Sequence, residues 1–255
     1  MHVATPLSTL LRDADEASRT RILELSHALE IRDHIDAKIR SALPRMYHCE
    51  LSIVAPWSDT EVAAAAHVIA TNNCKLVSFH ALSCFAKPVV EGRRFFPRGT
   101  PMSEAEMLKN ALSNMKRMRD AAGKRAYLVE NNNYFRNGAY ESIADPRFLT
   151  RVAKEADVGL LLDIGHAEIT AKHTESTLKI YVSALPLEKV RQIHLSGITR
   201  GAEEYLDSHE ALQDIDWKQF EDIRARCPAL EYVTIEYYKK PELLIGMLER
   251  LRTYI

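Results

Sequence analysis

Short apolar runs recur along the chain, and most are followed by a stretch in which apolar residues return with the period of a helix. Several runs, such as that from Gly159 to Leu162, are apolar at every position, which is typical of a parallel strand buried on both faces. We predict strands at His2–Thr5, Ala28–Arg32, Glu50–Val54, Lys75–His80, Arg125–Glu130, Val158–Asp163, Val190–Leu195 and Tyr232–Glu236. This many repeats in 255 residues predict a closed (β/α)8 barrel, the TIM-barrel fold, as a single domain over residues 1–255.

Capping signals indicate where several helices begin. Ser58 and Glu61 have the spacing of a capping box, and so do Ser103 and Glu106. The alternative fold, an open doubly wound sheet, would need a glycine-rich turn after the first strand, and the chain has no G-x-G-x-x-G motif. The other expected helices begin near Asp15, lie near Ile35–Leu43, follow Asp145-Pro146, and run from Pro241 to Arg252.

Charge and composition narrow the classes of partner. The chain has 34 Lys and Arg against 35 Asp and Glu, and this near-neutral balance argues against a nucleic-acid binder. No apolar run approaches the ~18 residues of a membrane span, and no secretory signal is visible at the start, so we expect no membrane association. The four cysteines form no C-x-x-C pair, which fits a cytoplasmic location: Cys49, Cys74, Cys84 and Cys227.

Ionisable residues stand where the predicted strands end, and in such barrels active sites lie at the carboxyl ends of the strands. Asp207 and His209 follow the seventh strand and, being two apart in an extended segment, point to the same side. Gly165 is expected to form a turn that brings His166 back toward the barrel axis. The residues at the strand ends are His80, Glu130, Asp163, His194 and Glu236.

These eight residues offer only nitrogen and oxygen donors, which suits Fe, Zn or Mn. Eight ligands are too many for one ion and predict two or three divalent ions. Any one of them alone would more simply be a turn residue, a helix cap or a hydrogen-bonded core residue, so the prediction depends on their joint placement. The other histidines are expected to be structural or surface residues: His2, His27, His34, His48, His67 and His173.

The pattern of Glu130, Asp163, His194 and Glu236 resembles the metal tetrad of the xylose-isomerase-like barrels, which include sugar isomerases, sugar epimerases and endonuclease IV. With the remaining predicted ligands, the set resembles two trinuclear branches: endonuclease IV and the multinuclear non-haem iron-dependent oxidases, which modify cysteine-containing peptides. The local sequence from Lys75 to Tyr238 is more similar to the oxidases.

Two positions depart from that resemblance. Both trinuclear branches place a histidine at the end of strand three, where this chain has Val54, so one ion is expected to lack a ligand. The oxidases often have asparagine where His166 stands, and histidine there is more similar to the endonuclease.

The resemblance implies an iron enzyme, an oxidoreductase that acts on a small-molecule or peptide substrate. Three alternatives stay open: a sugar isomerase or epimerase in which Glu130 or Glu236 moves a proton, a zinc phosphodiesterase, and a barrel whose metal is structural and which serves as a partner subunit. The loop after the fourth strand is expected to bind an anionic or aromatic group of the substrate, unless it is a solvated hairpin. The expected substrate-binding residues are Arg93, Arg94, Arg98 and Asn132.

Overall fold

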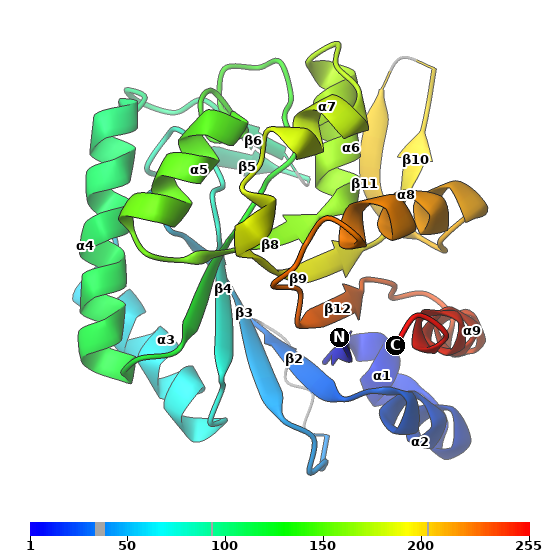
Figure 1. Cartoon of the computed structure of the whole chain (residues 1–255). Helices are drawn as coiled ribbons and strands as arrows, with labels where there is room; N and C mark the ends of the chain where they lie inside the picture. The colour runs from blue at the N-terminus through cyan, green and yellow to red at the C-terminus, as the bar shows by residue number, and fades with distance from the viewer. Residues whose placement is uncertain (34–38, 93, 203) are drawn as a thin grey trace.

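The computed structural model describes residues 1–33, 39–92, 94–202 and 204–255. Parallel strands form a closed barrel in the order β1-β12-β9-β8-β7-β4-β3-β2, and β2 pairs with β1 to complete the circle (Figure 1). The (β/α)8 barrel predicted from the alternating pattern is therefore confirmed. The barrel strands are β1 (His2–Pro6), β2 (Ala28–Arg32), β3 (Arg45–Ser52), β4 (Leu76–His80), β7 (Ala126–Glu130), β8 (Gly159–Asp163), β9 (Val190–Leu195) and β12 (Tyr232–Ile235).

Helices surround the barrel on its outside (Figure 1). Both predicted capping boxes are present, at Ser58 with Glu61 and at Ser103 with Glu106. Among the described residues, no helix has the length and apolar character needed to cross a bilayer. The helices are α1 (Thr9–Asp13), α2 (Glu16–Leu25), α3 (Asp59–Thr71), α4 (Glu104–Ala122), α5 (Pro146–Glu155), α6 (Ile164–His173), α7 (Leu178–Ser183), α8 (Asp214–Arg224) and α9 (Pro241–Arg252), with a 3-10 turn at Leu187–Lys189.

Two predicted elements near the third strand were wrong. The strand begins at Arg45, directly after Pro44, rather than at Glu50, and it ends at Ser52. The helix expected near Ile35–Leu43 falls partly on residues outside the description, and residues 39–43 are not helical. The apolar run after Glu50 was wrongly predicted to be strand, because Ile53 and Val54 are as buried as strand residues but belong to the turn beyond the strand.

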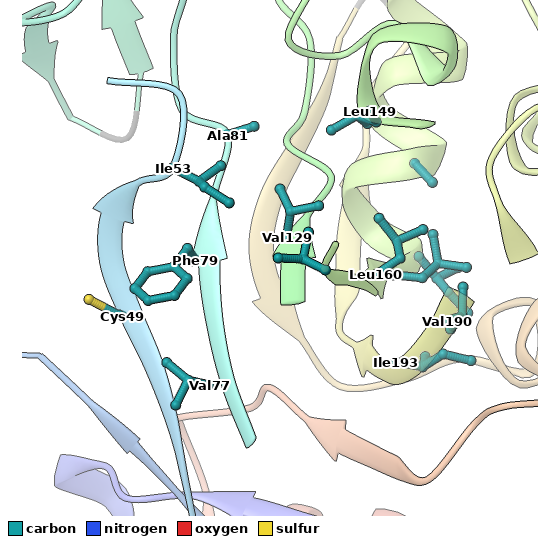
Figure 2. Packing of buried hydrophobic residues seen from close by; sticks show 14 of the residues in the cluster. Cys49, Ile53, Val77, Phe79, Ala81, Val129, Leu149, Leu160, Val190 and Ile193 are labelled. Atoms are coloured by element: carbon teal, nitrogen blue, oxygen red, sulfur yellow. The ribbon is translucent and has the colours of Figure 1, made fainter. Parts of the chain in front are cut away.

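The barrel strands bury different side chains on their two faces. Outward-facing residues such as Phe79, Val129 and Leu160 belong to the large core between strands and helices (Figure 2). A second, small apolar cluster lies inside the barrel. Since side chains alternate along a strand, residues two or four positions after its members also face the interior. The inner cluster consists of Ala4, Ala28, Met46, Leu76, Leu128 and Leu161.

Two antiparallel hairpins extend beyond the carboxyl ends of the barrel strands. The first follows β4 and consists of β5 (Val89–Glu91) and β6 (Arg94–Phe96). The second follows β9 and consists of β10 (Gly197–Arg200) and β11 (Tyr205–Glu210), which lies against α6 (Figure 1).

Candidate metal centre

The carboxyl ends of the barrel strands bring several of the predicted ligands together. His80 of β4 pairs with Glu130 of β7, and Asp163 of β8 pairs with His194 of β9. Glu236 directly follows β12, the next strand around the barrel. All of these side chains except that of His80 are buried, so the carboxylates and imidazoles meet one another inside the barrel mouth and not bulk water.

A first group combines His48 of β3 with His80 and Glu130, and one donor atom from each lies within 4.8 Å of the others. Oε2 of Glu130 is 2.7 Å from Nδ1 of His80 and 3.5 Å from Nε2 of His48. The other nitrogen of His48, Nδ1, lies 2.8 Å from the hydroxyl of Ser78, which leaves Nε2 to face Glu130. These three side chains can hold one ion.

The placement of His48 corrects two expectations. We expected His48 to be a structural residue outside the site, and we expected strand three, ending near Val54, to contribute no ligand. The structure instead places His48 beside His80 and Glu130, because β3 ends earlier and its alternation turns Met46 and His48 into the barrel, so strand three offers a candidate ligand. Val54 is buried in the outer core instead.

A second group surrounds His194. Its Nδ1 atom is 3.5 Å from Oε1 of Glu130 and 3.4 Å from Oε1 of Glu236. Its Nε2 atom lies 3.0 Å from Oε2 of Glu30, a buried acid on β2. Nδ1 is therefore the nitrogen of His194 that can share an ion with Glu130 and Glu236.

A third group joins α6 to the β10–β11 hairpin. Nδ1 of His166 is 3.0 Å from the carbonyl oxygen of Asn131 and donates to it, which leaves Nε2 to face Oδ2 of Asp207 at 3.7 Å. Nε2 of His209 is 3.6 Å from Oδ1 of Asp207 and 3.3 Å from Oε2 of Glu236. Donor atoms of His166, Glu130 and Asp163 lie within 4.8 Å of one another and could hold an ion, and Asp207 and His209 lie beside them.

The backbone around this third group is unusual at three positions. His209 has a φ of 46°, in the left-handed region that non-glycine residues rarely adopt and that is enriched at functional sites. A Cβ on Gly197 would lie 2.7 Å from the carbonyl oxygens of both Glu210 and Ala211, so the hairpin closes only with glycine there. Gly165 is helical and does not form the expected turn; its missing side chain makes room for Ser196.

The donor atoms lie at distances from one another that suit metal binding, and several of them have no hydrogen-bond partner. Oε2 of Glu130, Oδ2 of Asp163 and Nδ1 of His194 are buried and make no hydrogen bond. Buried polar atoms without partners are costly, and cations held in the first two groups would satisfy Oε2 of Glu130 and Nδ1 of His194. Two atoms that each lie about 2.1 Å from one ion are separated by about 3.0 to 4.2 Å, and most separations within the groups fall in that range.

The crowded carboxylates shift the pKa values of the site. Burial and neighbouring carboxylates raise the pKa of Asp163 to about 6. Burial alone would lower the pKa of His166, but Asp163 and Asp207 raise it well above its ordinary value. Burial and the nearby Arg32 lower the pKa of His48, which is therefore a neutral imidazole, the form that binds a metal.

The predicted substrate residues have different surroundings. Arg93 lies outside the described residues. Arg94 lines a cavity of about 490 Å³ that also reaches Asp207, and it stacks 4.4 Å above the ring of Phe135. Arg98 is exposed and does not line this cavity. The amide of Asn132 is buried and bonded to the backbone of Leu82 and of its own neighbour, so it supports the loop.

Comparison with known proteins places the chain in a family. The sequence model of the RiPP precursor modification enzymes MbnB/TglH/ChrH matches residues 31–241. The chain belongs to this family. The match includes every residue of the three groups, and it confirms the resemblance to the multinuclear iron-dependent oxidases. Members of the MbnB/TglH/ChrH family are described as modifying peptide precursors.

Individual relatives cover less of the chain. A UPF0276 protein of Paraburkholderia phytofirmans is 29% identical over 125 residues, which span 47% of this chain and 40% of that protein. A UPF0276 protein of Anaeromyxobacter is 30% identical over 104 residues, which span 41% of this chain and 36% of that protein. The chain thus matches well under half the length of these relatives.

Solved structures share the fold with this member of the MbnB/TglH/ChrH family. Endonuclease IV from Thermus thermophilus superposes with a TM-score of 0.65 at 17% identity, covering 100% of this chain and 98% of that chain. A xylose isomerase domain protein from Salmonella typhimurium gives a TM-score of 0.67 at 11% identity, covering 99% and 96%. These superpositions confirm the predicted barrel fold.

Proposed function

We propose that this chain is a metal-dependent oxidoreductase that modifies a cysteine-containing peptide at a trinuclear iron centre. The observation that carries the proposal is the convergence of nine imidazole and carboxylate donors on one barrel mouth, in a member of a family that modifies peptide precursors. The proposed ligands are His48, His80, Glu130, Asp163, His166, His194, Asp207, His209 and Glu236.

The charge of the donor set favours an anionic substrate. Glu130, Asp163, Asp207 and Glu236 carry four negative charges when ionised, and two divalent ions balance them. A third divalent ion leaves two positive charges in a largely buried site, where an unbalanced charge is costly. A substrate thiolate or another anionic ligand would reduce this excess.

The protein's own cysteines do not supply such a thiolate. All four are buried, and burial raises the pKa of Cys74 and of Cys227 to about 11 and that of Cys49 to about 12. The thiol would therefore come from the substrate. We propose that it enters through the cavity beside Asp207, whose lining is of mixed charge: Arg94 and Lys239 with Glu91, Asp207 and Glu210, together with Phe135, Asn133 and Ser208.

Bound iron would supply redox chemistry and open positions for the substrate and for O₂. The protein's own part is to hold that chemistry in place. Glu130 has one oxygen toward the first group and one toward His194, and Glu236 has one toward His194 and one toward His209. These two carboxylates thus join the three groups, which is the role we propose for them in place of proton transfer.

Metal analysis of protein purified without air tests the proposal. We expect between two and three iron ions per chain, with an EPR or Mössbauer signal of coupled iron. Less than one transition-metal ion per chain would exclude a multinuclear centre. The variant His209→Ala distinguishes this centre from a sugar isomerase that uses only Glu130, Asp163, His194 and Glu236: we expect it to lose about one ion, whereas the isomerase would retain its full metal content.

A further inference from the structure

A buried acid that is not among the proposed ligands lies directly beneath them. Glu30 of β2 is 0% exposed and stands two residues after Ala28, a member of the inner apolar cluster, so its side chain points into the barrel. A charge buried inside a barrel is costly unless it is paired, so Glu30 needs a partner.

Both carboxylate oxygens of Glu30 are occupied. Oε1 accepts from Arg32, at 3.0 Å from Nε and 2.6 Å from Nη2. Oε2 lies 3.0 Å from Nε2 of His194 and also accepts from Gln192, at 2.5 Å, and from the hydroxyl of Thr234, at 3.3 Å. Although burial alone would raise the pKa of Glu30, His194 and Arg32 hold it well below its usual range.

Glu30, His194 and Glu236 could by distance alone hold an ion of their own, because their donor atoms lie within 4.8 Å of one another. Arg32 argues against it. The Arg32 guanidinium bonds Oε1 of Glu30 and also contacts Oε1 of Glu236, so a fixed cation of the protein already lies between the two acids. Glu30 is therefore neutralised by Arg32 and left to act on His194.

We propose that Glu30 is a positioning residue for the metal centre. It accepts a hydrogen bond from Nε2–H of His194 and so fixes the tautomer and ring orientation that present Nδ1 to an ion shared with Glu130 and Glu236. Carboxylates that hold a ligating histidine in this way commonly raise metal affinity. The inference rests on the proposed metal centre, but it concerns which atom of His194 binds and what holds it there.

Zinc alone is the probe, because it is diamagnetic and its binding requires no substrate. Metal-free wild-type protein and the variant Glu30→Ala are titrated with zinc against a competing chelator. We expect Glu30→Ala to bind its weakest zinc ion about 10- to 100-fold less tightly. Glu30→Gln retains an oxygen that can accept from His194, and we expect it to recover affinity to within about threefold of wild type.

The NMR signals of the histidine rings distinguish a positioning role of Glu30 from a purely structural one, because a structural role would leave the His194 signals unchanged. In zinc-loaded wild-type protein, His194 should carry its proton on Nε2 and zinc on Nδ1, and in Glu30→Ala the Nε2 proton should lose its hydrogen-bonded shift. If Glu30→Ala does not fold, the double variant Glu30→Ala/Arg32→Ala, which leaves neither charge unpaired, should show the same loss. Glu231→Gln, an arginine-paired acid just before β12 at the opposite end of the barrel, is the control and should bind zinc like wild type.

The outcomes separate this inference from the proposed function. If wild-type protein binds no zinc, the metal centre and the role of Glu30 both fail. If wild-type protein binds two or three ions and the alanine variants match its affinity and its His194 signals, the centre stands and the role of Glu30 is refuted. Zinc on Nε2 of His194 would also refute it.

Discussion

His48 offers the sharpest test of the proposed centre, because its two ring nitrogens have separate partners. Nδ1 contacts the hydroxyl of Ser78 and Nε2 faces Glu130. The variant His48→Asn retains a polar group near the position of Nδ1 but has nothing at the position of Nε2. We therefore expect it to keep most of the stability of the metal-free protein and to lose one bound ion per chain.

The magnitude follows from burial. The His48→Ala variant leaves a cavity and a buried Ser78 hydroxyl without its partner, which together cost about 2–5 kcal/mol of unfolding free energy. His48→Asn keeps that bond and should lose only about 1–2 kcal/mol. In both variants the first ion retains two protein ligands, His80 and Glu130, so its affinity should fall by more than about 100-fold.

Two measurements check this. Urea unfolding of metal-free protein gives the stability, and mass spectrometry of metal-loaded, desalted protein gives the ion count. His67→Ala, an exposed histidine on α3, is the control and should change neither. A wild-type ion count in His48→Asn would refute the assignment of His48 as a ligand.

Three further predictions concern other parts of the chain. Arg94→Ala removes the ion pair to Glu204 that joins the two hairpins, and also a ring contact with Phe135. Hydrogen exchange in β10–β11 should therefore accelerate about fivefold, while Arg98→Ala should leave it unchanged; equal rates in both variants would contradict this. Gly197→Ala places a Cβ against two backbone carbonyls and should release the ion at Asp207 and His209; full ion content would contradict the role of the hairpin. The control is Gly246→Ala in α9, which has open space around it: it should retain every ion, and its free energy of unfolding should rise by up to about 1 kcal/mol. Burial raises the pKa values of all four thiols, so the native chain should resist alkylation at pH 8 at Cys49, Cys74, Cys84 and Cys227. Cys74 and Cys227 should react faster only as the pH approaches 11, and rapid labelling at pH 8 would contradict this.

The barrel could be predicted because its strands are buried on both faces and its helices begin with clear caps. The positions of His80, Glu130, Asp163, His194 and Glu236 followed from one rule, that parallel strands in a barrel end at one face. That rule places a residue at a rim but gives no depth along the barrel axis. Depth depends on how far neighbouring strands are staggered, which no single strand reveals.

His48 and Glu30 were missed for this reason. His48 is followed by four more residues of β3 and pairs with Ser78, two residues before the end of β4, yet its ring lies 4.4 Å from that of His80. Glu30 lies two residues before the end of β2, and the strand-end rule considers only the last residue of each strand. The β10–β11 hairpin was likewise not predicted. Its residues Asp207 and His209 could still be predicted, because alternation in an extended segment places them on one side wherever the segment packs.

The small apolar cluster inside the barrel has a consequence for how ions and substrate reach the donors. It fills the barrel interior below the donors with side chains that offer water and ions no ligand. In the part of the chain that the structure describes, the β5–β6 and β10–β11 hairpins extend beyond the opposite end, at the carboxyl ends of the barrel strands. A peptide bound at these hairpins would therefore slow the exchange of a bound ion with a chelator.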